Sequence, residues 1–185
     1  MLSSNTILKI SVGISMLTLI FSCKNDIKEV RDFLADENLP IGVAENINTV
    51  YKDSGQITTK LLSPLLYDYS NRDRHPYSEF PQGLHITKID ENRDSITVDG
   101  DYAITYSKTN IAEIRKHVII VNYTNNYKLK TEQIFWDQNL HYFVTEKPFT
   151  LYTPTDTLMG EGFESKENLT QWYVKNNSGV LQVND

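Results

Sequence analysis

The chain has 185 residues, with 18 lysine and arginine residues against 24 aspartate and glutamate residues, a net charge of −6 and one cysteine. This length fits about one domain that can bury a core of its own. The acidic balance argues against a nucleic-acid partner and against a polybasic contact with anionic lipid, and a single cysteine excludes an internal disulfide framework.

The N-terminus has the pattern of an export signal. Lys9 is followed by the uncharged apolar run Ile10 to Phe21, which is typical of a secretory signal peptide and is shorter than the about 20 residues that a membrane-spanning helix needs. The segment Ile20-Phe21-Ser22-Cys23 resembles a bacterial lipobox, in which the cysteine becomes the acylated first residue of the mature protein. We therefore expect a lipoprotein signal peptide at 1–22 and a lipid on Cys23. A plain signal peptide followed by a stray thiol is the alternative.

Residues 23–43 are predicted to form the lipidated N-terminus and a short stalk. Charged side chains crowd the stretch from Lys24 to Asn38. The spacing of Ile27, Val30 and Leu34 is compatible with a short amphipathic helix, but the density of charge favours a solvated, irregular stalk.

Residues 44–185 are predicted to form one all-β domain, because short runs rich in Val, Ile, Thr, Tyr and Phe recur between turn residues. Only the stretch 109–116 is also compatible with a helix. The predicted strands are 45–51, 56–62, 65–69, 84–90, 94–99, 101–107, 117–123, 127–136, 141–145, 149–152, 157–163, 169–175 and 179–184.

The connections between these strands are short and carry turn residues. Ser54-Gly55, Asn125-Asn126 and Ser178-Gly179 are typical of hairpin turns. Pro81 with Gly83 fits a type I turn, which favours Pro at its second position and Gly at its fourth. Short strands joined by local turns predict an antiparallel sandwich, jelly roll or barrel.

Alternation along each strand selects the residues that face inward. The pattern suits a closed core and an open cleft for lipid equally well, and a slip of one residue would move any of these side chains to the opposite face. The candidate groove residues are Ile86, Val98, Val118, Ile120, Leu129, Phe143, Leu151 and Met159.

The sequence offers no catalytic constellation. The four histidines stand apart without metal-ligand spacing, and neither a nucleophile elbow nor a phosphate-binding glycine loop is present. Asp90, Asn92, Asp94 and Asp101 match positions of a calcium loop, but Ser95 stands where that loop needs glycine. We expect a charged hairpin turn there, and no enzyme activity, metal or cofactor.

Several segments recur in a fixed order along the chain. After a first hairpin at Tyr51-Lys52-Asp53-Ser54-Gly55 they are Tyr77-Ser78-Glu79-Phe80-Pro81-Gln82-Gly83-Leu84, Gly100-Asp101-Tyr102-Ala103, Val118 to Asn122, Leu129 to Asp137, and Met159-Gly160-Glu161-Gly162-Phe163. Together, through their order and spacing, these segments resemble the LptC family in its Bacteroidetes-type form, and the resemblance covers roughly 44–184. LptC proteins are the periplasmic, membrane-anchored component of lipopolysaccharide export.

The resemblance implies a twisted, open, antiparallel β-jelly roll of the LptA/LptC/OstA kind. Its inner faces would hold the acyl chains of lipid A, and its unpaired edges would add to like domains. The N-terminal edge would meet the periplasmic domains of the export ABC transporter, and the C-terminal edge would meet the LptA bridge protein. That C-terminal edge is expected at Gly179, Val180, Leu181, Gln182 and Val183.

The expected location is the periplasm, with lipidated Cys23 as the anchor in the inner membrane. Many family members use an N-terminal transmembrane helix instead, so the sequence leaves the choice of membrane open. The alternative function is an envelope lipoprotein of β-sandwich fold that binds another lipid, a carbohydrate or a protein. Trp136 and Trp172 are candidate sugar platforms in that alternative, although amphipathic positions at the rim of a sandwich account for them as well.

Overall fold

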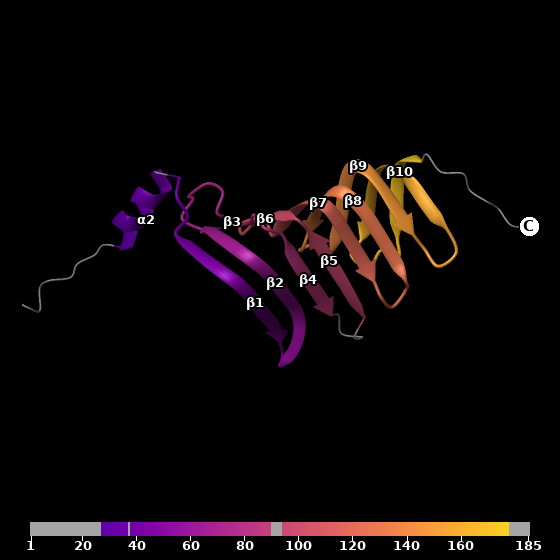
Figure 1. The fold of residues 1–185 in the computed structure, drawn as a ribbon, viewed down its shortest axis with the longest axis horizontal. Helices are drawn as coiled ribbons and strands as arrows, with labels where there is room; N and C mark the ends of the chain where they lie inside the picture. The colour runs from indigo at the N-terminus through magenta and orange to yellow at the C-terminus, as the bar shows by residue number, and fades with distance from the viewer. Residues whose placement is uncertain (1–26, 37, 90–93, 178–185) are drawn as a thin grey trace, which may run out of the picture.

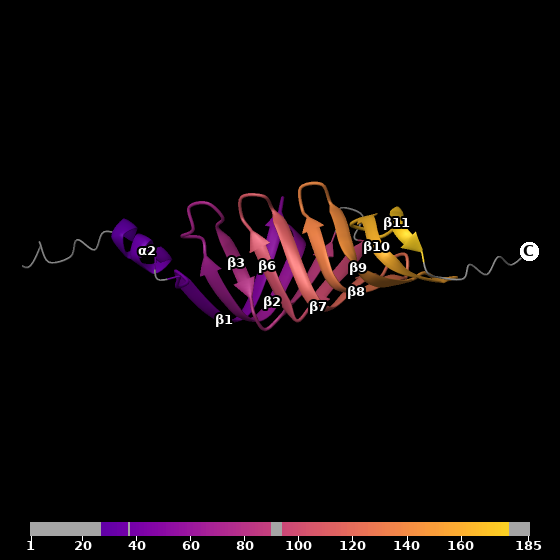
Figure 2. The ribbon, with the colours of Figure 1, turned by 90° about the horizontal axis from the view of Figure 1, so that it is seen from above.

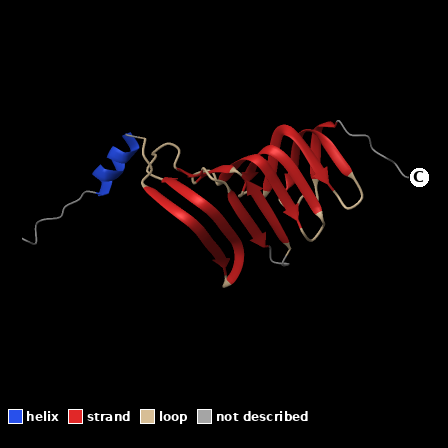
Figure 3. Ribbon diagram, in the orientation of Figure 1, coloured by secondary structure: helices blue, strands red, loops and turns tan. Residues whose placement is uncertain are grey.

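A computed structural model describes residues 27–36, 38–89 and 94–177 of the chain. Strands make up most of this part, with a single helix before them (Figure 3). The elements are α2 (Ile27–Asp36), β1 (Gly42–Asp53), β2 (Gln56–Tyr69), β3 (Tyr77–Phe80), β4 (Leu84–Ile89), β5 (Ser95–Gly100), β6 (Tyr102–Tyr106), β7 (Ile111–Asn122), β8 (Tyr127–Asp137), β9 (Tyr142–Tyr152), β10 (Thr157–Lys166) and β11 (Trp172–Asn177).

All strand pairs are antiparallel, and the long strands belong to two layers at once. The first part of β7 pairs with β6, whereas its second part, after a shift of register, pairs with β5. In the same way β2 pairs with β4 through one half and with β3 through the other. The first layer therefore contains β4 and β5, the second contains β3 and β6, and β1, β2, β7, β8, β9 and β10 bend from one layer into the other.

The chain turns the corner between the layers at irregular positions, either within a long strand or in the connections from β3 to β4 and from β5 to β6. Such irregularities bend a strand, and several of these corner residues have the positive φ that only Gly and a few other residues adopt readily. The corner positions are Asn46 (φ 53°), 81–83, Asp101, Lys116 (φ 63°) with His117 (φ 49°), Glu132, 146–147 and Gly162 (φ 79°).

The corners stack into a closed edge, and the hairpin tips form the opposite, open side. The two layers thus make an elongated, V-shaped roll. α2 lies at one end of its long axis, next to β1 and β2, and β10 and β11 lie at the other end (Figures 1 and 2). The prediction of a twisted antiparallel β-jelly roll is confirmed.

The helix is attached to the roll by the loop that follows β2. Asn38 has a φ of 57°, the left-handed conformation that commonly ends a helix, and Leu39 N–H donates to the Leu34 carbonyl at 2.8 Å. The Arg72 guanidinium donates to the carbonyls of Ala35 and Leu39 and, at 2.9 Å, to the Asn38 side chain. The stretch for which the sequence favoured an irregular stalk thus contains a helix, the alternative that its apolar spacing allowed.

Four further elements differ from the sequence prediction. Residues 111–115 are strand, not helix, because they complete the second layer between β6 and β8. Segments 56–62 and 65–69 are one strand bent at Pro64, and 141–145 and 149–152 are one strand bent at 146–147. β3 was missed because it has only four residues and ends directly at Pro81.

Candidate functional site

Most of the predicted groove residues are buried between the two layers. Ile86 is nearly buried, and six others are fully or almost fully buried in the core: Val98, Val118, Ile120, Leu129, Phe143 and Leu151. These six fill the half of the roll that lies toward β10, so their side chains form a closed core there.

Met159 is a correction to the predicted set. Its side chain is 49% exposed, whereas its neighbour Leu158 is 9% exposed. The burial pattern of β10 alternates with Leu158 and Gly160 facing inward. The inward residue is therefore Leu158, and the prediction missed it by one residue.

An open cleft of about 620 Å³ lies in the other half of the roll, toward α2. Its walls come from both layers, because β1, β2 and β4 form one side and β3, β6 and the ends of β7 and β8 form the other. Of the predicted groove residues, only Ile86 lines it. Apolar lining residues include Ile47, Leu61, Leu66, Phe80, Leu84, Ile111 and Trp136.

The cleft ends at a charged side chain. Lys88 on β4 lines the cleft, and its Nζ lies 5.7 Å from the ring centre of Trp136 on β8. Nζ donates to Glu167 Oε1 at 2.7 Å and to Oε2 at 2.5 Å, so the positive charge at this end is paired. The cleft is otherwise lined by apolar, hydroxyl and amide side chains and by Tyr51 and Tyr106, a lining suited to an acyl chain rather than to an ionic ligand.

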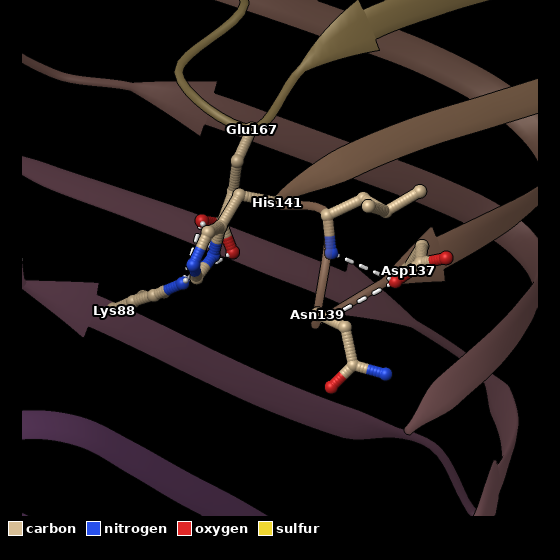
Figure 4. Close-up of polar contacts among 6 residues, drawn as sticks. Lys88, Asp137, Asn139, His141 and Glu167 are labelled. Atoms are coloured by element: carbon tan, nitrogen blue, oxygen red, sulfur yellow. Dashed lines mark hydrogen bonds and ion pairs between the residues drawn. The ribbon is translucent and has the colours of Figure 1, made fainter. Parts of the chain in front are cut away.

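Beyond Lys88 the open side of the roll is covered by the turn at 167–171, between β10 and β11. Figure 4 shows Glu167 of this turn meeting Lys88, with His141 beside them. His141 Nδ1 lies 3.1 Å from both Lys88 Nζ and Glu167 Oε2. Nearby, Asp137 Oδ1 accepts the N–H groups of Asn139 and Leu140 at 2.9 Å and so shapes the hairpin tip that carries His141.

Two of the segments that carry the family resemblance, 77–84 and 100–103, meet at the corner. Gly83 (φ 85°) has so little room that a Cβ would lie 2.5 Å from the Gly100 carbonyl oxygen. Tyr102 Oη donates to Glu79 Oε1 at 2.6 Å, which joins the same two segments on the outer face. Burial and this hydrogen bond raise the pKa of the Tyr102 hydroxyl above its ordinary value.

The histidines of the described chain do not gather into one site. His85 pairs with Asp99, His117 with Asp101 and His141 with Glu167. Across the residues that the structure describes, no group of three or more His, Cys, Asp or Glu side chains is placed to hold a metal ion. The predicted charged hairpin turn lies partly outside those residues, since Asp90 and Asn92 belong to 90–93.

Two predicted sites lie outside the described residues: Cys23, and the docking edge Gly179, Val180, Leu181, Gln182 and Val183. Within the described part, β1 pairs only with β2, and β11 pairs only with β10. Each end of the roll thus presents a strand with one unpaired edge.

The sequence analysis missed the residues that form the open cleft. Along 57–61, apolar Ile57 and Leu61 alternate with Lys60, but Leu62 is apolar as well and is 42% exposed, so the inward face was ambiguous. Trp136 was placed at a rim, yet it is buried in the wall of the cleft. The alternation of apolar and polar residues identifies the face of a strand that points inward. Whether the opposite layer covers that face can be seen only when both layers are placed.

Comparison with known families agrees with this architecture. The family model described as "Lipopolysaccharide-assembly, LptC-related" matches residues 8–179. No curated protein sequence matches the chain. Within 27–36, 38–89 and 94–177, no helix is long and apolar enough to cross a membrane. LptC proteins are periplasmic components of lipopolysaccharide transport and are not known as enzymes. The family match and the β-jelly roll together place this chain in the LptC family.

Proposed function

We propose that this protein receives lipopolysaccharide from the inner-membrane ABC transporter and passes it to an LptA-like bridge, with the acyl chains held between its two layers. The observation that carries the proposal is the open cleft of about 620 Å³ with apolar walls from both layers. Membership of the LptC family supports a part in lipopolysaccharide transport. The protein would act without catalysis, and the partner's ATP hydrolysis would drive the lipid forward.

The unpaired edges support the handover. An exposed strand edge is a liability in an isolated protein, but two such edges at opposite ends let like domains join into one longer sheet through main-chain hydrogen bonds. β1, at the end where the cleft is open, would face the transporter. The other end, at β11 and the following segment 179–183, would face the bridge protein.

The anchor in this proposal is a lipid on Cys23, with the protein in the periplasm at the inner membrane. The four Cα-to-Cα steps from Cys23 to Ile27, where α2 starts, span at most about 14 Å when fully extended. The helix would therefore hold the open end of the cleft close to the membrane surface from which lipopolysaccharide is extracted. Intact mass of the membrane-extracted protein tests the anchor, and an unmodified Cys23 would rule it out.

Site-specific photocrosslinking in cells tests the lipid path. A small diazirine amino acid replaces Leu61, which lines the cleft, or the neighbouring Lys60, which is exposed on the opposite face. The proposal expects lipopolysaccharide adducts from position 61 and none from position 60. Equal capture from both positions, or none from position 61, would contradict it. Capture of another lipid or of a sugar would favour the alternative of an envelope lipoprotein with a different ligand.

A further inference from the structure

The turn at 167–171 crosses the open side of the roll and is held there by three successive residues. Glu167 binds Lys88 of the first layer, and its side chain is only 12% exposed. The Asn168 carbonyl accepts a 2.7 Å hydrogen bond from Asn122 Nδ2, also of the first layer. Leu169 is fully buried in the core. This turn, which belongs to the second layer, thus closes the gap between the two layers.

The closed arrangement contains two unfavourable features. Leu169 has a φ of 59°, a left-handed conformation that costs a leucine free energy and persists only where its surroundings hold it. Trp136 Nε1 is buried without a hydrogen-bond partner, although buried N–H donors are nearly always paired. Trp136 lies in the cleft wall beside Lys88, so both features occur where the cleft meets the turn.

The interior continues under this turn as apolar surface. Val98, Ile120, Leu129 and Leu151 are fully buried there, and Val98 stands opposite Ile86, which lines the open cleft. The open cleft and the closed half are therefore one apolar layer, and the boundary between them is Lys88 with its partner Glu167.

We propose that the turn at 167–171 is a lid, and that the apolar compartment beneath it is a second acyl-chain site that opens when Glu167 leaves Lys88. Side chains of the core fill the closed compartment. An acyl chain can therefore enter it only after the two layers separate on this side. The proposal rests on the proposed function for the nature of the ligand. The lid itself is testable without any ligand.

Thiol labelling measures the opening directly. In the full-length protein, Val98→Cys places a reporter beneath the lid, and peptide mapping separates its label from any label on Cys23. Three variants each remove one contact of the lid: Lys88→Met, Glu167→Gln and Leu169→Asn. Asn is chosen at position 169 because it tolerates positive φ. We expect each variant to raise the labelling rate at position 98 by about tenfold or more. A buried charged hydrogen bond or a buried Leu side chain stabilises the closed lid by a free energy of that order.

Two controls separate lid opening from general loosening. Arg115→Met removes a bidentate pair with the buried Glu113, but both residues lie on β7 and the pair bridges no layers, so it should leave the rate at position 98 unchanged. Ala103→Cys is a fully buried reporter between β3 and β7, and lid variants should leave its rate unchanged. Equal acceleration at 98 and 103, or no acceleration at 98, would overturn the lid.

A covalent crosslink that holds the lid closed tests the second acyl-chain site. In this locked protein, Lys88→Cys and Glu167→Cys are joined by a short bismaleimide. A diazirine amino acid is placed at Leu61 in the cleft or at Leu129 beneath the lid. Purified lipopolysaccharide should be captured from both positions in the unlocked protein and from position 61 alone in the locked protein. Capture from position 129 despite the lock, or from 61 alone before locking, would refute the second site. Capture from neither position before locking would contradict the proposed function, while the labelling result would still decide the lid.

Discussion

Gly83 and Gly100 touch at the corner of the roll: a Cβ on Gly83 would lie 2.5 Å from the carbonyl oxygen of Gly100. The contact joins the turn between β3 and β4 to the end of β5, where the chain passes into β6. It gives a physical reason for glycine in two of the segments that resemble the LptC family.

Replacing Gly83 by alanine should destabilise the fold strongly, since the new methyl group meets backbone that cannot move aside. Gly55→Ala is the matched control, because Gly55 has nearly the same φ (83° against 85°) and open space around its Cβ position. The left-handed conformation alone costs an alanine about 1–2 kcal/mol. Gly55→Ala should therefore lower the free energy of unfolding by that amount, and Gly83→Ala should lower it clearly more. Urea unfolding measures both, and equal losses would show that crowding at Gly83 is absent.

The register of β10 predicts opposite outcomes for two neighbours. Leu158→Ala should cost about 2–5 kcal/mol of unfolding free energy, as for other buried leucines. Met159→Ala should cost less than about 1 kcal/mol, because the side chain lies on the outer face. Thermal or urea unfolding of the two variants measures the difference. A larger loss of unfolding free energy from Met159→Ala than from Leu158→Ala would mean that Met159 faces inward, as expected from the sequence.

Arg72 should control the order of α2. An isolated helix of ten residues is marginal in water, and the Arg72 guanidinium supplies both hydrogen bonds and positive charge at its C-terminal end. In Arg72→Met, amide hydrogen exchange across 31–39 should accelerate while exchange in β7 and β8 stays unchanged. Arg74→Met, which alters an exposed arginine of the same loop, serves as the control. Unchanged exchange in Arg72→Met would mean that the helix is held by other contacts.

The corner pair His117–Asp101 should titrate. His117 Nδ1 lies 2.6 Å from Asp101 Oδ2, and this hydrogen bond, together with the carboxylate charge, raises the pKa of His117 above its ordinary value of about 6.5. The folded state then binds the proton more tightly than the unfolded state. The pair's contribution to stability is fully present below about pH 6.5 and disappears as the pH rises through the raised pKa.

NMR titration of the His117 ring measures this shift. Asp101→Asn should move the pKa of His117 back toward its ordinary value, whereas Asp99→Asn, which removes the carboxylate beside His85, should leave it in place. Since both side chains of the pair are largely exposed, any change in the urea midpoint should be small. An unaltered pKa in Asp101→Asn would show that the two side chains do not pair in solution.

The sequence predicts the strands and the core better than it predicts the open space. Ile120, Leu129 and Leu151 are inward because alternation is a local property of a strand. The bends at Pro64 and at Lys116 with His117 were misjudged, since a corner interrupts the alternation while the strand continues. Local pattern therefore split some strands and left 109–116 compatible with a helix.

The candidate site depends on contacts across the sequence. Lys88 and Glu167 are 79 positions apart, and neither lies in a motif that marks it. The cleft beside Ile47 and Leu61 exists because the opposite layer does not cover these side chains fully. A local sequence pattern cannot show whether the opposite layer covers a residue. The sequence therefore indicated the family, but it placed the groove in the half of the roll that is closed.

Purification of the full-length protein from its own membranes in mild detergent, followed by mass spectrometry of bound lipid and co-purifying proteins, tests the central claim most directly. The account predicts lipopolysaccharide and the export transporter with the unaltered protein. Leu61→Asp, which places a charge in the cleft, should lose the lipid and keep the transporter, while Lys60→Asp on the outer face should keep both. Another lipid in place of lipopolysaccharide, or equal lipid in all three preparations, would contradict a lipopolysaccharide path through this cleft.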